Sequence, residues 1–308
     1  MWFRDVLVEK SANREAFMSV IEGLDLRPPV VIKPNWGTSV CFTEAEILDW
    51  ILTAVDGDAV VVESYGWGRS EEAVKTGRLG SKKRGDLRRS DVWFLKYSGV
   101  GEVLERHGVE FLNLTEENWG RRTANPEVIR EIVEAKHRPV QMEELYGFVP
   151  ERLYDLRGSD LLSLAKVKVW MEPIVVSFSV KNLFGMIPGP SRWRFHGKQH
   201  SRLSRSIVDV YEVYDSLFNI KGVVEAVLTA SIMDQEKKRA VIHENPGFVA
   251  GSKSPLDLDA VVTTAIGRDP SEIGYLKLAS ETFGGWDEEV VSQAAESGLS
   301  VLCKPTHE

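Results

Sequence analysis

The segment from Lys166 to His200 is the most distinctive part of the sequence, and it contains three runs: KVKVW at 166–170, SVKNLFGMIPG at 179–189 and RWRFHGKQH at 192–200. Between Lys166 and Arg205 the chain gathers eight lysine and arginine residues against a single acid, Glu172. The whole chain has a formal net charge of −8, so this segment concentrates positive charge within an acidic protein. A focused positive field of this kind favours an anionic ligand.

Two strand–turn–helix units precede this segment. Residues 28–33 form an apolar run that predicts a buried strand ending at Lys33, and a turn then leads to a helix over 43–55, for which Thr43 and Glu46 have the spacing of a capping box. Residues 59–63 predict a second buried strand, which ends at Glu63. In a parallel sheet the carboxyl ends of the strands share one edge, where ligands collect. We therefore expect Lys33 and Glu63 at the same edge.

The same alternation continues through the chain. Apolar runs predict strands at 109–113, 160–168, 222–228, 247–251 and 300–303, and helical spacing or capping residues predict helices at 12–24, 100–107, 126–135, 173–182, 203–218, 255–267 and 287–298, with a further helix start at 269–272. The basic stretch 75–89 is predicted to be a long exposed loop or lid, and 138–160 a hairpin or irregular segment.

This alternation predicts an α/β fold with a mainly parallel sheet flanked by helices and a ligand crevice at the carboxyl ends of the strands. The 308 residues are expected to form a single α/β unit, or two intimately packed lobes that divide near 140–160.

Composition excludes several classes of protein. The acidic charge and the pI near 5.5 argue against a general nucleic-acid binder. No apolar run reaches eighteen residues, so no membrane span is expected, and the N-terminal residues lack the pattern of a signal peptide, which favours a cytoplasmic location. The two cysteines, Cys41 and Cys303, are too few for the four thiolates of an iron–sulfur cluster, so we expect no such cluster. No residues are selected as a metal site, and whether a metal ion binds is left open.

Four lysines are candidates for binding the anion. Lys33, Lys166 and Lys168 lie near predicted strand ends and Lys181 near a predicted helix end, all within apolar segments. This placement favours a shared crevice, whereas the alternative is that each is an exposed lysine whose stem covers apolar surface. A buried ammonium needs an anion or a partner to keep its proton, and Glu63 is the nearest candidate partner.

His196 is the candidate for proton transfer in the basic segment. It lies between Arg194 and Lys198, whose charges favour the neutral imidazole. A neutral ring can act as a base or bind a metal, although a loop histidine without a role is the alternative. Glu63 is the second candidate for moving a proton.

The runs Lys33-Pro-Asn35, Lys166-x-Lys168, Lys181-Asn182-Leu-Phe-Gly185, His196 and Asp259-Ala-Val resemble those of the family described as domain of unknown function 362, over roughly residues 28–282. The resemblance implies that Lys33, Asn35, Lys166, Lys168, Lys181, Asn182 and Asp259 belong to one substrate site. For Asp259 the alternative is simple helix-dipole stabilisation in the helix capped at Ser254.

Three positions depart from the family pattern. Trp170 replaces a histidine, Glu225 replaces an aspartate, and Ser254-Pro255 replaces Asp-Pro, which implies a divergent site with a different ligand. Many family members also carry an additional ferredoxin-like iron–sulfur segment, and this chain has too few cysteines for one.

Two functions remain open. The first is an enzyme that acts on a small carboxylated or phosphorylated metabolite, with the lysines holding the anion and His196 or Glu63 moving a proton. The second is a non-catalytic small-anion-binding protein or a partner subunit of a redox system, which the ferredoxin-like segments of the resembled family imply.

Overall fold

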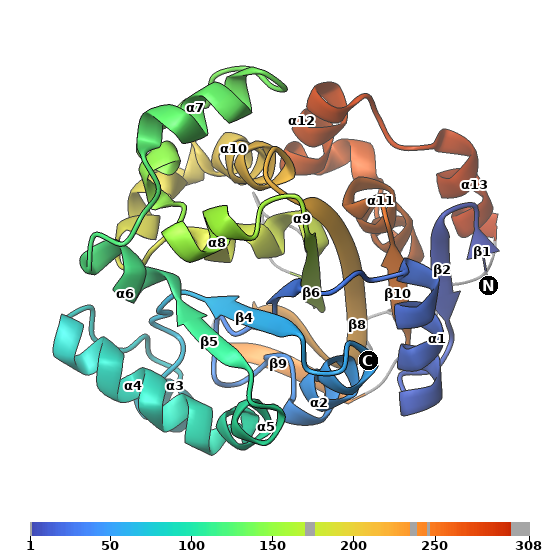
Figure 1. Cartoon of the computed structure of the whole chain (residues 1–308). Coiled ribbons are helices and arrows are strands. Elements are labelled where there is room, and N and C mark those ends of the chain that lie inside the picture. The colour runs from blue at the N-terminus through green and yellow to red at the C-terminus, as the bar shows by residue number, and fades with distance from the viewer. Residues whose placement is uncertain (1, 170–175, 235–238, 245–246, 297–308) are drawn as a thin grey trace.

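In the described part of the chain, ten strands form one sheet in the middle of the molecule, with helices on both of its faces (Figure 1). The computed structural model describes residues 2–169, 176–234, 239–244 and 247–296. The strand expected at 300–303, the beginning of the helix expected at 173–182 and the end of the helix expected at 287–298 lie outside the described residues. The α/β class predicted from the alternation is confirmed.

The strand order shows a mostly parallel sheet with an antiparallel edge. From one edge to the other the order is β1 (Trp2–Phe3), β2 (Val6–Glu9), β10 (Val249–Ser252), β8 (Asn219–Asp234), β6 (Asp160–Val169), β3 (Val30–Lys33), β4 (Ala59–Glu63) and β5 (Glu110–Asn113). The five strands from β8 to β5 are parallel to one another, whereas β10, β2 and β1 continue the sheet antiparallel. The short β7 (Val176–Ser177) and β9 (Arg239–Glu244) pair antiparallel with β6 and β8.

The direction of the chain reverses between β3 and β6. From β3 the chain proceeds outward through β4 to β5, and it then returns to the other side of β3 as β6. Lys33, the last residue of β3, is paired with Ser163, so β6 continues six residues beyond the end of β3. A ligand site in an open α/β sheet lies outside the strand ends at such a reversal.

Each face of the sheet carries its own hydrophobic core. One core packs under α1 (Arg14–Leu24), α2 (Ala45–Ala54), α4 (Arg84–Tyr97) and α5 (Val100–His107). The other packs under α7 (Pro126–Glu134), α8 (Glu151–Asp155), α10 (Leu203–Asp215), α11 (Pro255–Ala265), α12 (Gly274–Phe283) and α13 (Glu288–Glu296). The expected helix start at Ser254 is confirmed, because its side chain accepts a hydrogen bond from the Asp257 amide and Pro255 is the first helical residue.

Shorter helices connect these layers. They are α3 (Glu71–Thr76), α6 (Leu114–Trp119), α9 (Ser179–Asn182) and the 3₁₀ helices η1 (Glu143–Phe148), η2 (Leu183–Met186), η3 (Ser191–His196), η4 (Lys198–His200) and η5 (Pro270–Glu272). Among the described residues no helix is both long enough and apolar enough to cross a bilayer.

The prediction of a long loop over 75–89 is wrong in its extent, because only residues 77–83 lie outside helices. Residues 71–76 form α3, which ends at Gly77 in the left-handed conformation, and α4 begins at Arg84. Leu87 and Phe94 bury one face of α4, while its basic residues lie on the exposed face. The many basic residues suggested an exposed loop. The buried residues Leu87 and Phe94 are seven positions apart, which is the spacing of one helix face.

The predicted capping box at Thr43 is also wrong. Glu44 precedes the first helical residue, and it makes no capping hydrogen bond. The Thr43 hydroxyl accepts a hydrogen bond from the Asn35 amide at 2.9 Å instead. Thr43 thus fastens the turn after β3 rather than the start of α2.

Several other segments also differ from expectation. Residues 138–160 contain η1 and α8 rather than a hairpin or irregular chain. Within 173–182 the described residues form the strand β7 and only a four-residue helix, α9, because β7 pairs with the end of β6. The strand expected at 222–228 is present as part of β8, but the extension of β8 to Asp234 and the strands β1, β2 and β9 have no counterpart in the sequence-based prediction.

Candidate functional site

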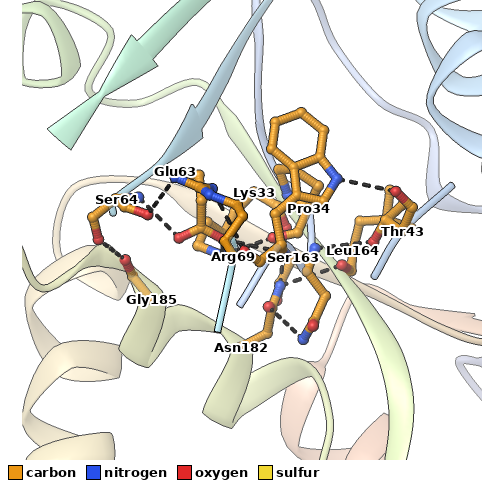
Figure 2. A network of polar contacts seen from close by, with 12 residues as sticks. Lys33, Pro34, Thr43, Glu63, Ser64, Arg69, Ser163, Leu164, Asn182 and Gly185 are labelled. Carbon is orange, nitrogen blue, oxygen red and sulfur yellow. Dashed lines mark hydrogen bonds and ion pairs between the residues drawn. The ribbon is translucent and has the colours of Figure 1, made fainter. Parts of the chain in front are cut away.

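Lys33 and Glu63 form a buried ion pair at the ends of β3 and β4, as Figure 2 shows. The distance from Lys33 Nζ to Glu63 Oε2 is 2.8 Å, and the two side chains are 1% and 3% exposed. The amides of Trp36 and Ser64 also donate hydrogen bonds to the Glu63 carboxylate. Burial acts to raise the pKa of Glu63, but the nearby cations Lys33, Arg192 and Arg69 outweigh it and lower that pKa.

Gly185 explains why this ion pair can lie directly under η2. A Cβ atom at this position would lie 2.7 Å from Lys33 Nζ and 3.0 Å from Glu63 Oε1, which is too close for either atom to stay in place. The glycine of the Lys-Asn-Leu-Phe-Gly run therefore allows η2 to approach the two charged groups.

Lys166 forms a second buried ion pair, at the end of β6. Its Nζ lies 2.9 Å from Glu44 Oε2 and 2.7 Å from Glu225 Oε1, and Glu225 is its direct neighbour on β8. Burial acts to lower the pKa of Lys166, but Glu225 and Glu44 together outweigh it and raise that pKa. Burial raises the pKa of Glu225 to about 7, although Lys166 opposes the shift. Glu225, a departure from the resembled family pattern, is thus a partner of Lys166.

Lys168 is buried but has no carboxylate partner among the described residues. Its Nζ donates to Asn35 Oδ1 at 2.5 Å, and Asn35 Nδ2 donates to Asn182 Oδ1 at 3.0 Å. Asn182 Nδ2 in turn donates to the carbonyl of Lys33 and to Ser163 Oγ (Figure 2). Burial is the main cause that lowers the pKa of Lys168. The two asparagines thus join β3, β6 and α9 beneath this lysine.

Lys181, on α9, is half-buried and reaches the same group of cations. Its Nζ donates to Ser177 Oγ at 3.3 Å, and no carboxylate within the described part of the chain pairs with it. Burial, followed by the charges of Lys168, Arg192 and Lys33, lowers the pKa of Lys181 to about 8.

Two arginines complete the group, and the sequence-based selection missed both. Arg69 is 1% exposed and forms an ion pair with Asp91 of α4. Arg192 is half-buried on η3, where it donates to Ser64 Oγ and to the carbonyls of Gly185 and Ile187. Arg192 belonged to the basic segment, so its charge was a signal, whereas nothing local distinguished Arg69. We call these six residues the cation cluster: Lys33, Arg69, Lys166, Lys168, Lys181 and Arg192.

His196 lies beside the cation cluster at the end of η3. Burial, then the charge of Lys181, lowers its pKa to about 4, so the imidazole is neutral at pH 7. Its Nδ1 lies 3.0 Å from Nδ1 of His200, and its ring packs against Phe184 and the exposed Trp193. The direction of this shift matches the neutral ring expected from the sequence, but its causes are burial and the charges of Lys181, His200 and Arg192 rather than those of Arg194 and Lys198.

Asp259 lies under α9. It is fully buried on α11, and its two carboxylate oxygens accept hydrogen bonds from the amides of Ser179 and Val180 at 2.8 and 2.9 Å. Burial raises the pKa of Asp259 to about 8, and the two amides oppose the shift. Both oxygens therefore cap the start of α9, the helix that carries Lys181, rather than the start of α11, the helix to which Asp259 belongs.

The described residues contain no group of three or more histidine, cysteine, aspartate or glutamate side chains arranged to hold a metal ion. Cys41 is buried near Lys168 and Lys166; burial raises the pKa of its thiol, and the two lysines oppose that shift. The donor groups that face one another here are ammonium, guanidinium, amide and imidazole groups, and these suit an anion better than a cation.

The fold and this arrangement of side chains define an open, mainly parallel α/β protein with a buried cation cluster at the reversal point of its sheet. Residues 30–264 match the family model Domain of unknown function (DUF362), and the chain belongs to that family. The match spans every candidate site residue from Lys33 to Asp259, and the resemblance seen in the sequence is confirmed. No curated protein and no solved structure matches the chain.

Proposed function

We propose that this protein is an enzyme that binds a small anionic metabolite, a carboxylate or a phosphate, at the carboxyl ends of β3 and β6, with His196 moving a proton. The observation that carries the proposal is the unequal pairing within the cation cluster. Lys33, Arg69 and Lys166 have carboxylate partners, whereas Lys168, Lys181 and Arg192 have none among the described residues. A buried cation without a counter-charge is costly, and a bound anion removes that cost.

The position of the unpaired cations supports a ligand site rather than a structural core. Lys168 is on β6, Lys181 on α9 and Arg192 on η3, so three separate elements bring them together at the reversal point of the sheet. Lys181, Arg192 and the neighbouring His196 are half-buried, which leaves these groups partly accessible from solvent.

His196 is a better candidate for proton transfer than Glu63. Three hydrogen bonds already engage the Glu63 carboxylate, and one of them is its ion pair with Lys33. His196 is neutral at pH 7, because burial and then the charge of Lys181 lower its pKa. An anion bound next to Lys181 would offset that charge and raise the pKa of His196 toward the range useful for a base.

Binding is tested by thermal unfolding with sulfate against chloride at equal ionic strength. We expect sulfate to raise the melting temperature of the wild type, with a contribution of about 1 to 3 kcal/mol at ten to a hundred times Kd. Lys181→Met should lower the affinity for sulfate at least tenfold, whereas Lys198→Met, which changes an exposed lysine nearby, should not. If chloride raises the melting temperature equally, the effect is ionic screening and the proposal of an anion site is wrong.

Catalysis is tested with the molecule that the protein retains through purification, identified by mass spectrometry. We expect His196→Gln to retain an unconverted substrate where the wild type retains product or nothing. If both proteins retain the same anion unchanged after incubation, the protein binds the anion without converting it, and the non-catalytic alternative replaces the enzyme.

A further inference from the structure

The charges within and around the cation cluster do not balance. Its six cations meet four described carboxylates: Glu63 beside Lys33, Asp91 beside Arg69, and Glu44 and Glu225 beside Lys166. If all ten groups are ionised, two positive charges remain without a counter-charge. Burial raises the pKa of Glu225 to about 7 and Lys166 opposes the shift, so at pH 7.5 this carboxylate counts as ionised.

The two uncompensated charges lie at the unpaired cations. Among the described residues Lys168 contacts the amide oxygen of Asn35, Lys181 contacts the hydroxyl of Ser177, and Arg192 contacts one hydroxyl and two carbonyls. All of these acceptors are neutral, so they satisfy hydrogen bonds without neutralising charge. The lowered pKa values of Lys168, Lys181 and Arg192 follow first from burial, and for Lys181 the cations around it add to the effect.

Within the described part of the chain, several hydrogen-bond donors of these cations have no acceptor. Each ammonium has three N–H groups and donates only one of them to a described residue, to Asn35 for Lys168 and to Ser177 for Lys181. Arg192 uses Nε and Nη2, and its Nη1 has no acceptor among the described residues. Two ammonium groups and one edge of a guanidinium thus offer several donors to a ligand that brings only acceptors.

We propose that the ligand is a dianion, with two negative charges held by Lys168, Lys181 and Arg192. This inference rests on the proposed anion site and narrows its ligand. A monoanion leaves one buried positive charge uncompensated, and a trianion brings one negative charge too many, so a dianion is the best match. A phosphate monoester and a dicarboxylate share this chemistry, because each carries two negative charges and only acceptor oxygens near neutral pH.

The experiment measures affinity by isothermal titration at pH 7.5 and constant ionic strength, with chloride as the background anion. The probes are acetate as a monoanion, sulfate and succinate as dianions, and citrate as a trianion. We expect at least one dianion to bind tenfold or more tightly than both acetate and citrate. Tighter binding of sulfate indicates a phosphate group, and tighter binding of succinate indicates a dicarboxylate.

The variant Lys181→Met reduces the excess from two charges to one. Its preference for the better dianion over acetate should therefore fall at least tenfold, while Lys198→Met, on the exposed surface, keeps the wild-type preference. Lys181→Gln repeats the test with a polar side chain should the methionine variant fold poorly. If acetate binds as tightly as sulfate and succinate, the ligand is not a dianion, but the proposal of an anion site still holds. If no probe binds more tightly than chloride, both proposals fail.

Discussion

At the scale of single residues, the lysines of the candidate site are of two kinds. Lys33 and Lys166 are held by carboxylates, whereas Lys168 and Lys181 are held only by neutral groups among the described residues. The alternative considered from the sequence, that each is an exposed lysine, does not hold, because three are at most 4% exposed and Lys181 is half-buried. Lysines of the same candidate site thus differ in whether a carboxylate compensates their charge.

The two kinds should respond in opposite ways to loss of charge. Lys33→Met leaves the buried carboxylate of Glu63 without its ion-pair partner, and we expect a loss of roughly 3 to 5 kcal/mol in the free energy of unfolding. Lys181→Met removes a cation that other cations surround, so the ligand-free protein should keep its stability or gain some. Chemical denaturation of both variants without added anion measures the difference. A large loss of unfolding free energy in Lys181→Met would show that Lys181 stabilises the fold rather than serving ligand binding.

The pH dependence of anion binding should report Lys181. Its pKa of about 8 means that the ligand-free site loses a charge above this pH. Sulfate affinity should therefore be level below pH 8 and fall above it, by up to about one power of ten per pH unit. In Lys181→Arg the guanidinium stays charged, so the fall should begin at a higher pH. Identical profiles for the two proteins would exclude Lys181 as the titrating group.

The same shift affects stability with a defined sign. The folded-state pKa of Lys181 is lower than its ordinary value of 10.5, so between pH 8 and 10.5 the unfolded chain binds more protons. The contribution of Lys181 to the free energy of unfolding is therefore least favourable below pH 8 and rises with pH through that window.

At the scale of elements, the position of the short helix α9 depends on a contact with α11. The helix has only four residues, and Asp259 of α11 accepts hydrogen bonds from its first two amides. A helix this short is not stable by itself, so its tertiary contacts determine where Lys181 and Asn182 lie.

Asp259→Asn should disturb this arrangement. The asparagine places an NH₂ group where one oxygen accepts an amide hydrogen, so one buried amide loses its acceptor, at a cost of about 1 to 3 kcal/mol. We expect a lower melting temperature together with weaker sulfate binding, because α9 carries Lys181. Asp257→Asn is the matched control on the half-buried first turn of α11, away from α9. Normal sulfate affinity in Asp259→Asn would show that α9 holds its position without this contact.

At the scale of the whole molecule, the sheet is continuous across the two halves of the chain. Strand β6, from the second half, lies between β3 of the first half and β8. The core beneath α10 and α11 also contains Val31, Val60 and Leu112 of β3, β4 and β5. Each half therefore completes its core with residues of the other.

This interleaving predicts cooperative unfolding. Differential scanning calorimetry of the full chain should show one transition, because neither half keeps a complete core when the other unfolds. Two separated peaks would instead support the alternative of two packed lobes that divide near 140–160.

Much of the fold could be predicted from periodicity. The strands ending at Lys33 and Glu63, the helix at 14–24 and the capped helix at 255–265 are all present near the expected bounds. Prediction failed where side-chain composition competed with spacing, as in α4, and where pairing with a distant strand decided the structure, as in β2 and β7. Strand pairing depends on a partner elsewhere in the chain, and local sequence does not contain it.

The sequence by itself determined which residues stand at the carboxyl ends of β3, β4 and β6, because apolar runs end where polar side chains begin. Only the tertiary structure decided the partner of each charge. Lys166 meets Glu44 across 122 positions of sequence, and Asp259 reaches Ser179 across 80. The physical reason is that periodicity reports whether a side chain faces the interior, whereas ion pairing depends on distances of a few ångströms that arise only when separate elements pack together.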